Sequence, residues 1–536
     1  MTATEPTSKP PAPPAVRSER YTNPYVGILG VFLGAGIATL NSRLVSVGLP
    51  DLRGALGLGF DEASWIPTAL NMATMFSGVF VVFLAVVFGP RRILLQAAAI
   101  FAVTSALLPF APGYWAMLAM VVIAGIASGT FYSLTMTFVL TALPKKLIIF
   151  GIAAYAADIV FVSNIASLVE GWYIEHLSWH WIFWTAALVT PVMMVCIYLG
   201  IPRRPPAPFR PSWRGFAYFS VGLALVYGAL DQGERLDWLN SGVIVGMLTG
   251  GVFLVLAAAI RRMLQPNPTL QLSFLKSRNI VILALSVFAF KFVHLATIVL
   301  IPGFLGNVQQ YRSLQTGHAL AWVALPMLAV VWLVAIVVLH TTSRLTLALG
   351  LTVVAVACWI CAHLDTLWAG SSFEAAELLL AAGLGGTYIG LVASIVLQGL
   401  ESGALASATT AATFSGFIHF IRLFGGQTGS ALMTHFIAVR EKFHSNLLGL
   451  HVQAGSWLTD ERLRMLTGGL FSASDGADEA QYRAVGILSQ QVRAQAYTLA
   501  TADGFVLAGL MAAAYLLLML FLRPARISFQ DLRKMQ

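Results

Sequence analysis

The segment from Ile280 to Phe304 reads IVILALSVFAFKFVHLATIVLIPGF, and within it only Lys291 and His294 can carry a charge. A helix that crosses a hydrocarbon core of ~30 Å needs roughly 20 predominantly apolar residues. This segment is long enough and apolar enough for that task. It therefore predicts one membrane-spanning helix, with two ionisable groups near its middle.

Thirteen other segments share this character, so we expect the chain to cross a membrane fourteen times. Hydrophobic residues make up 58% of the 536 residues and charged residues only 10%, and the mean hydropathy is +0.79. The predicted fold class is an all-α polytopic membrane protein. The expected spans are 25–49, 63–88, 93–111, 114–142, 148–173, 180–201, 213–230, 242–260, 280–304, 317–340, 345–363, 376–399, 405–437 and 503–522.

The basic residues between these spans fall on one side. Excess Lys and Arg in short cytoplasmic loops is the positive-inside rule, so an even number of spans with both termini cytoplasmic is predicted. The net charge of +9 and the pI near 9.6 follow from this arrangement, and we do not interpret them as nucleic-acid binding. The inner loops and C-terminal tail carry Arg91, Arg92, Lys145, Lys146, Arg203, Arg204, Arg210, Arg261, Arg262, Lys276, Arg278, Arg344, Arg523, Arg526, Arg533 and Lys534. The outer loops carry Asp51, Asp61, Glu62, Glu175, Asp231, Glu234, Asp237, Asp365, Glu374 and Glu377.

The spacing of the spans predicts a 6+2+6 organisation, with two six-helix halves and a substrate site between them near the midplane. Helical pieces are expected in the long outer loop, one capped at Thr459, one starting at Asp478, with a break at Gly468-Gly469. The expected parts are a disordered tail 1–24, a first half 25–202, a linker with two extra spans 203–278, a second half 279–523 with a periplasmic loop 441–498, and a tail 524–536.

Several classes of function are not supported by the sequence. No metal-ligand spacing, phosphate loop or nucleophile elbow occurs, so we predict neither an enzyme nor a cofactor. Cys358 and Cys361 have the spacing of a redox motif, but an apolar helix does not stabilise a thiolate, and we interpret them as packing residues.

Ionisable residues inside the spans are the candidates for function. Each costs roughly 2.5–3.5 kcal/mol at the centre of a span. Asp158 lies ~14 Å along its span and Lys291 ~18 Å along its own, in different halves. Both are candidates for substrate or proton handling, and a static ion pair between them is the structural alternative. His294 shares the helix face of Lys291 and could instead be a packed histidine.

Four further positions belong to the predicted substrate and proton pathway. His419 and Arg422 share a face of the thirteenth span, and Arg422 could also brace helices. Asn41 is an uncharged polar group expected to face the interior. Arg43 lies close to it and could extend to the outer interface instead. Taken together, the candidate interior holds five basic groups and one clear acid, which favours an anionic, partly hydrophobic substrate.

Five short motifs lie in order at the expected spans. They are Leu40-Asn-Ser-Arg-Leu-Val-Ser-Val-Gly-Leu-Pro50, Ala63-Ser-Trp-Ile-Pro-Thr-Ala-Leu-Asn71, Ser178-Trp-His-Trp-Ile-Phe-Trp184, Leu230-Asp-Gln-Gly-Glu-Arg-Leu-Asp-Trp-Leu-Asn240 and Arg422-Leu-Phe-Gly-Gly-Gln-Thr-Gly429. With these motifs the chain resembles the fourteen-span drug/proton antiporter branch of the major facilitator superfamily, in particular the Emr-type inner-membrane efflux pumps, over nearly all residues after 25.

The chain also departs from the family pattern. The acid of the family's first span falls on Asn41, which cannot titrate, and Arg43 stands where the family has a hydroxyl. The arginine position of the fourth span falls on Val121. If transport is coupled to protons, Asp158 is therefore the best remaining carrier, with His294 as a helper.

The resemblance implies a secondary active efflux transporter of the bacterial inner membrane, coupled to the proton motive force. It also implies a periplasmic adaptor and an outer-membrane channel as partners. The alternatives are an organic-anion transporter that imports or is not proton-coupled, and a membrane sensor that does not transport.

Overall fold

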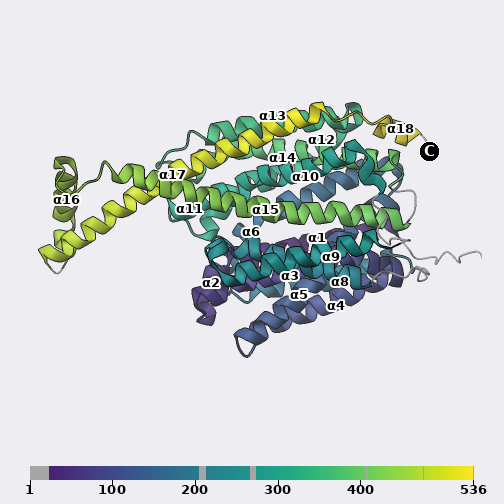
Figure 1. The fold of residues 1–536 in the computed structure, drawn as a ribbon, viewed down its shortest axis with the longest axis horizontal. Helices are drawn as coiled ribbons and strands as arrows, with labels where there is room; N and C mark the ends of the chain where they lie inside the picture. Colours follow the sequence, from purple (N-terminus) through teal and green to yellow (C-terminus); the bar gives the residue numbers. More distant parts are fainter. Residues whose placement is uncertain (1–22, 204–212, 266–272, 405–407, 475, 535–536) are drawn as a thin grey trace, which may run out of the picture.

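The computed structural model describes residues 23–203, 213–265, 273–404, 408–474 and 476–534, and within them every regular element is a helix. Twelve of these helices are long and apolar enough to cross a membrane. Helices α8 (Trp213–Gln232) and α15 (Ala408–Gly449) lie alongside them in the same bundle (Figure 1). The predicted fold of fourteen spans is thereby confirmed. Residues 1–22 of the expected tail, and Arg204 and Arg210, lie outside the described residues.

The first half has six long helices, and five of them enclose one apolar core, while the buried apolar face of α6 (Ile148–His176) packs against the second half. Leu44, Leu70, Phe101, Phe131 and Phe183 are buried in this core. Gly89 takes a positive φ of 86° directly before Pro90, which allows a sharp turn between the second and third of these helices. The helices are α1 (Pro24–Val47), α3 (Phe60–Phe88), α4 (Pro90–Leu107), α5 (Tyr114–Ala142), α6 (Ile148–His176) and α7 (Trp181–Gly200), with a short α2 (Leu49–Leu56) after α1.

The second half follows the inserted hairpin of α8 and α9 (Gly242–Met263). Its first span is interrupted by a π-helical turn at Ala296–Leu300, just before Pro302. Proline cannot donate a helical hydrogen bond, and a π-turn is one way for a helix to accommodate that loss. The helices are α10 (Arg278–Leu295), α11 (Ile301–Asn307), α12 (Ser313–His340), α13 (Ser343–Cys361), α14 (Glu374–Glu401), α15, α17 (Ala477–Leu520) and the short α18 (Phe529–Lys534).

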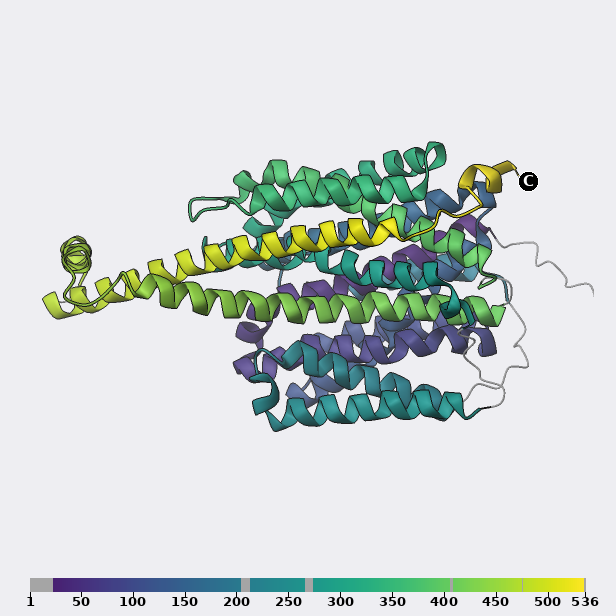
Figure 2. The same cartoon turned by 45° about the horizontal axis from the view of Figure 1, so that its top comes forward.

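Helix α1 begins and α17 ends on the same side of the bundle, which we call the terminal face (Figure 1). On the opposite side, the protrusion face, α15 and α17 extend well beyond the other helices and hold α16 (Trp457–Leu470) at their tip (Figures 1 and 2). The 42 residues of α15 span about 63 Å, roughly twice the hydrocarbon thickness of a bilayer.

The protrusion corrects two details of the sequence analysis. The cap of α16 is Ser456, whose hydroxyl accepts a hydrogen bond from the Thr459 amide at 3.3 Å, so Thr459 is already inside the helix. Gly468 and Gly469 do not interrupt the helix but lie in the last turn of α16. The Ser456 hydroxyl, three residues before Thr459, accepts from one free amide of the first turn, which is what an N-cap side chain does.

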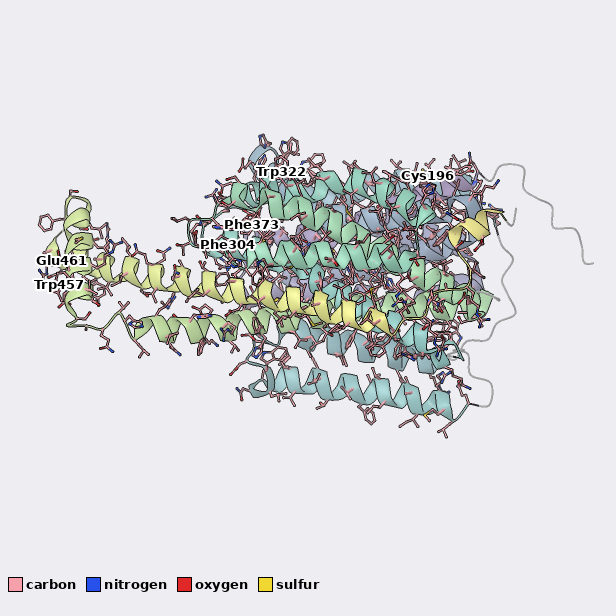
Figure 3. The ribbon with its side chains drawn as sticks, turned by 90° about the horizontal axis from the view of Figure 1, so that it is seen from above. Cys196, Phe304, Trp322, Phe373, Trp457 and Glu461 are labelled. Atoms are coloured by element: carbon pink, nitrogen blue, oxygen red, sulfur yellow. The ribbon has the colours of Figure 1, made fainter. Side chains whose placement is uncertain are left out.

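Apolar side chains cover much of the outer surface of the bundle. Trp322 is 43% exposed and points outward, while Phe304 and Phe373 meet between helices with ring centroids 5.8 Å apart (Figure 3). Trp457 lies at the tip of the protrusion with Glu461 (Figure 3). An apolar exterior around a packed apolar interior is what a chain surrounded by lipid requires.

The two halves meet most closely along α6 and α12. A Cβ atom on Gly171 would lie 2.3 Å from the Leu314 amide nitrogen, and one on Gly317 would lie 2.3 Å from Leu168 Cα. Both contacts are near the ends of these helices at the protrusion face. Small residues allow such backbone approach between membrane helices, and here they seal the halves together on that side.

Candidate functional site

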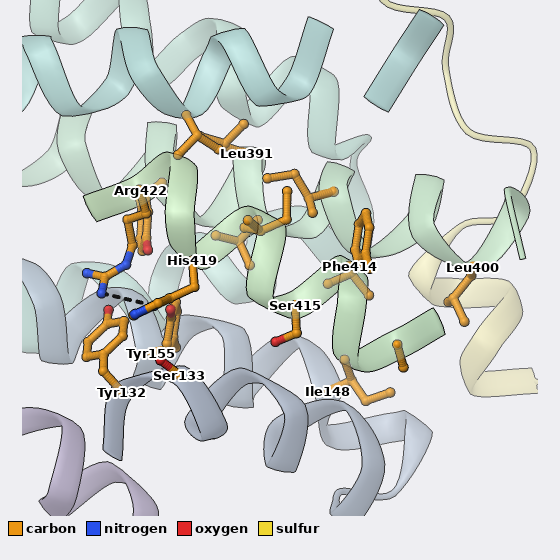
Figure 4. Close-up of a pocket in the computed structure, with 17 residues that line it drawn as sticks. Tyr132, Ser133, Ile148, Tyr155, Leu391, Leu400, Phe414, Ser415, His419 and Arg422 are labelled. Carbon is orange, nitrogen blue, oxygen red and sulfur yellow. Dashed lines mark hydrogen bonds between the residues drawn. The ribbon is translucent and has the colours of Figure 1, made fainter. Parts of the chain in front are cut away.

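A cavity of about 190 Å³ lies between the two halves (Figure 4). The first half contributes α5 and α6 to its wall, and the second half contributes α10, α14 and α15. Its position between the halves agrees with the site expected from the 6+2+6 organisation. Residues that line it include Tyr132, Tyr155, Val287, Tyr388, His419 and Arg422.

The polar end of the cavity is formed around Arg422. Its guanidinium carbon lies 3.5 Å from the centroid of the Tyr132 ring, in a cation–π contact between the halves. The guanidinium also donates to Nδ1 of His419 at 3.4 Å (Figure 4), while its Nε has no hydrogen-bond partner. A buried cation with donors left unpaired is a site prepared for an anion.

Three tyrosines continue from this point into the second half. The rings of Tyr132 and Tyr155 are 5.3 Å apart, those of Tyr155 and Tyr388 are 6.2 Å apart, and Tyr388 stacks on Phe290 at 4.6 Å. The sequence analysis did not single them out. Their positions in mid-span were the available signal, because tyrosine in membrane proteins usually gathers at the interfaces.

The remaining wall of the cavity is apolar and extends toward the terminal face. Leu391 and Ile395 of α14 and Phe414 of α15 line this part, and Ile148 and Leu400 lie at its outer end. Toward the protrusion face the halves are sealed by the α6–α12 contact. The cavity therefore has a cationic inner end and an apolar outer part, a distribution that complements an amphiphilic anion.

The other predicted pathway residues lie outside the wall of this cavity. Asn41 and Arg43 lie on α1, Asp158 on α6, and Lys291 and His294 on α10. Asn41 Oδ1, Arg43 Nε, one Asp158 oxygen and both ring nitrogens of His294 are buried without a hydrogen-bond partner. Arg43 does not extend to the interface but lies near enough to Lys291 and His294 to repel a positive charge on either. His419 and Arg422 are thus the only pair of the predicted set that lines the cavity described here.

Asp158 and Lys291 do not form the ion pair considered from the sequence. The charges that act on Lys291 are those of Arg422 and Arg43, both of the same sign, and within the described part of the chain no ion pair joins it to Asp158. The charge that acts on Asp158 is that of Arg422. One Asp158 oxygen packs over Gly36 of α1, 2.7 Å from where a Cβ would lie. Around Arg422, two basic side chains therefore oppose a positive charge on a third, Lys291, and the acid that interacts with this group is Asp158.

Close packing of α10 on α15 holds the Lys291 side chain between these two helices. A Cβ on Gly425 would lie 3.3 Å from Phe288 Cα, and one on Gly429 would lie 3.6 Å from Phe292 Cα. Gly426, between them, faces the stem of Lys291 at 3.7 Å. Gly425 and Gly429 therefore allow the close contact between the two helices. They hold the ammonium-bearing side chain in the interior against α15.

Other chemistry is poorly provided for. No group of three or more potential metal ligands occurs within the described residues. Cys196, Cys358 and Cys361 are free, and the last two are buried. What the arrangement can do is bind a small molecule that carries negative charge at one end and apolar surface at the other.

Comparisons with known proteins agree with this fold. The sequence profile described as "Major Facilitator Superfamily" matches residues 31–425. The "Multidrug export protein EmrB" of Haemophilus influenzae is 24% identical over 506 residues, covering 92% of this chain and 95% of that protein. The "Fatty acid resistance protein FarB" of Neisseria gonorrhoeae is 23% identical over 295 residues, covering 55% and 58%. Among solved structures, the human organic anion transporter MFSD10 (TETRAN) shares the fold, with a TM-score of 0.52, 14% identity, and coverage of 91% of this chain and 99% of that one.

The contact between Arg422 and Tyr132 can be tested by a double-mutant cycle. We expect Arg422→Met and Tyr132→Leu to be coupled by about 2 kcal/mol in the free energy of unfolding in detergent, because a desolvated cation–π pair has roughly this strength. Tyr132→Phe, which keeps the ring, is expected to retain most of the coupling. Additive effects of the two substitutions would show that the ring does not hold the guanidinium.

Proposed function

The chain belongs to the major facilitator superfamily, and we propose that it is a secondary active transporter that exports small anionic amphiphiles across a bacterial inner membrane. Members of this family are transporters and not enzymes. Multi-pass insertion in a membrane and the transport of a small molecule follow from the fold and the family. The direction of transport and the substrate class are the proposal.

One observation supports the substrate class most strongly. Arg43, Lys291 and Arg422 lie in one buried region with a single acid, Asp158, and Arg422 opens into a cavity whose other wall is apolar. A pump for lipophilic cations would be expected to offer acids in such a place. A substrate carboxylate would instead supply the counter-charge that this interior lacks. The similarity to a protein named for fatty acid resistance points in the same direction.

The structure also suggests how export would begin. The seal at Gly171 and Gly317 closes the protrusion face, and the cavity extends toward the terminal face. The terminal face carries Arg92, Lys146 and Arg344, which favours a cytoplasmic location. In this arrangement an amphiphile enters from the cytoplasm with its apolar part along α14. Its anion then reaches Arg422 and weakens the repulsion that keeps Lys291 and Arg43 apart.

Binding of the anion would bias the protein toward the opposite arrangement. Only a ligand that contacts the two states differently can shift their equilibrium. A carboxylate between cations of both halves makes such a difference, because Arg43 lies on the first half and Lys291 and Arg422 on the second. The proton motive force is the energy source that we propose, with Asp158 as the proton carrier and without a bound cofactor. Asn41, at the position of the family's acid, cannot titrate.

The protrusion is the part of the molecule available to partners outside the membrane. We propose a periplasmic adaptor, and through it an outer-membrane channel, as partners of this transporter. The support is the length of α15 and α17 beyond the bundle and the similarity to an Emr-type pump over most of the chain.

The proposed orientation has a direct test. In a background that lacks Cys196, Cys358 and Cys361, an impermeant maleimide is expected to label Gln453→Cys in intact cells whose outer membrane is permeable. Arg92→Cys, also exposed but on the terminal face, is expected to react only after the inner membrane is opened. The reverse pattern would place the protrusion in the cytoplasm.

Proton coupling is tested at Asp158. We expect Asp158→Asn to abolish transport driven by a pH gradient in sealed vesicles, because the amide occupies the same volume but cannot exchange a proton. Asp478→Asn, an acid exposed at the start of α17, is the matched control and is expected to transport normally. Gradient-driven transport by Asp158→Asn at the wild-type rate would mean that protons cross elsewhere.

The substrate class is tested at Lys291. We expect Lys291→Met to lower transport of acidic compounds about tenfold, or ~1.4 kcal/mol, because it removes one positive charge from the buried region that attracts the anion. Lys291→Arg is expected to keep part of the activity, since the charge remains but its shape changes. Lys146→Met, an exposed lysine, serves as the control. An equal loss for compounds of every charge, or the largest loss for cations, would contradict the anionic substrate.

A further inference from the structure

We call the cavity at Arg422 the substrate cavity. A second hollow of about 240 Å³ lies outside it, on the other side of α15. The residues of α15 divide cleanly between the two. Phe414, His419 and Arg422 line the substrate cavity, whereas Gly416 and Phe420 line the second hollow, which we call the hairpin groove. One helix is therefore the common wall of two sites.

The hairpin groove is formed by the halves of four helices nearest the terminal face. Val79 and Phe83 of α3, Phe216 of α8, Val255 of α9 and Phe420 of α15 contribute its apolar wall. Along α15 the groove covers the residues from 413 to 420, or about 10 Å of helix. Toward the middle of the bundle it ends at the rings of Phe219 and Phe420, which lie 5.7 Å apart.

Basic and polar side chains edge the outer end of the groove. Arg261, Arg262 and Gln265 lie at and just after the last turn of α9, at the terminal face. The Nε atom of Arg261 is buried and has no hydrogen-bond partner. An apolar channel with cations at its membrane-surface end has the polarity of an anionic lipid, with chains inward and headgroup outward.

The opposite end of the inserted hairpin is held firmly, so the groove is confined to the terminal face. Asp231 accepts a hydrogen bond from Thr68 of α3 at 2.5 Å and another from Gln427 of α15 at 2.7 Å. Glu234, in the turn after α8, pairs with His435 of α15 at 2.5 Å. Burial raises the pKa of the Glu234 carboxyl, but hydrogen bonds from Trp238 and His435 and nearby positive charge outweigh this and hold the pKa below its ordinary value.

From these contacts we infer that the hairpin groove binds an anionic phospholipid of the leaflet at the terminal face, with an acyl chain among its phenylalanines and the phosphate at Arg261 and Arg262. A phospholipid fits better than a soluble anion because the apolar wall is continuous with the lipid-facing surface of α9, where Leu256 and Ile260 are more than half exposed. The leaflet is the cytoplasmic one under the orientation proposed above, but binding itself does not depend on transport or its direction.

A lipid in this position would occupy the space between the inserted hairpin and α15. Because the other face of α15 carries His419 and Arg422, the lipid would support the helix on which the substrate cavity depends. The inserted hairpin thereby gains a role that a twelve-span transporter of the same fold lacks.

The test is native mass spectrometry of the purified full-length protein in detergent, with phosphatidylglycerol and phosphatidylcholine of the same acyl chains as the probes. We expect the wild type to bind phosphatidylglycerol more tightly. Arg261→Gln should lower its affinity for phosphatidylglycerol about fivefold, the factor that corresponds to ~1 kcal/mol per basic residue, and leave phosphatidylcholine unchanged. Arg261→Lys, which keeps the charge, should restore most of the difference.

A second variant blocks the chains instead of the headgroup. A Cβ on Gly416 would have its nearest neighbours at 3.8 and 4.0 Å, so Gly416→Leu can extend into the groove and is expected to weaken both lipids together. Arg344→Gln, on the terminal face of the second half, and Gly246→Leu, on α9 with nothing within 4 Å, are the matched controls and should change neither.

Three results would overturn the inference. They are equal affinity of the wild type for the two lipids, an effect of Arg344→Gln as large as that of Arg261→Gln, and displacement of phosphatidylglycerol by a single-chain fatty acid at equal concentration. The last would assign the groove to substrate. If the wild type binds phosphatidylglycerol selectively but does not transport, only the proposed function fails.

Discussion

A guanidinium buried between two halves of a membrane protein has to be stabilised without water, and the contact of Arg422 with Tyr132 meets that need. The cation comes from α15 of the second half and the ring from α5 of the first. The contact can therefore exist only while these helices lie close together. A ring face attracts a cation but does not neutralise it, so the charge remains available to an anion. The polar end of the cavity and part of the repulsion that acts on Lys291 depend on this one incompletely compensated charge.

Helix α15 connects several features that are separate in the sequence. It carries His419 and Arg422 toward the substrate cavity, presents Gly425, Gly426 and Gly429 to α10, and turns Gly416 and Phe420 toward the hairpin groove. Farther along, Gln427 and His435 bind the turn of the inserted hairpin, and the last residues enter the protrusion. A movement of α15 would thus reach the substrate, the groove and the exterior together.

The spans could be predicted from the sequence because a backbone within lipid must satisfy its own hydrogen bonds, as a helix does. Long apolar runs identify such helices without any knowledge of tertiary contacts. Arg422 and His419 could be paired from their spacing on one helix. Tyr132, Tyr155 and Tyr388 could not, because their contact depends on how α5, α6 and α14 are placed relative to one another, and helix period carries no information about that. The pairing of Asp158 with Lys291 failed for the same reason. The sequence places each residue along its span, but two residues at a similar depth need not face each other. A helix starting at Asp478 was predicted, but its continuity with the last span and the extension of α15 beyond the bilayer were missed, because polar residues lower hydropathy without ending a helix.

The central claim is that a cationic interior selects anionic amphiphiles. It is tested most directly by equilibrium binding of a matched pair of ligands to the purified protein, a medium-chain fatty acid and the primary amine of the same chain length, at a pH where both are charged. The account predicts that the acid binds at least tenfold more tightly and that Arg422→Met removes most of this preference. Equal binding of the two, or a preference for the amine, would contradict it.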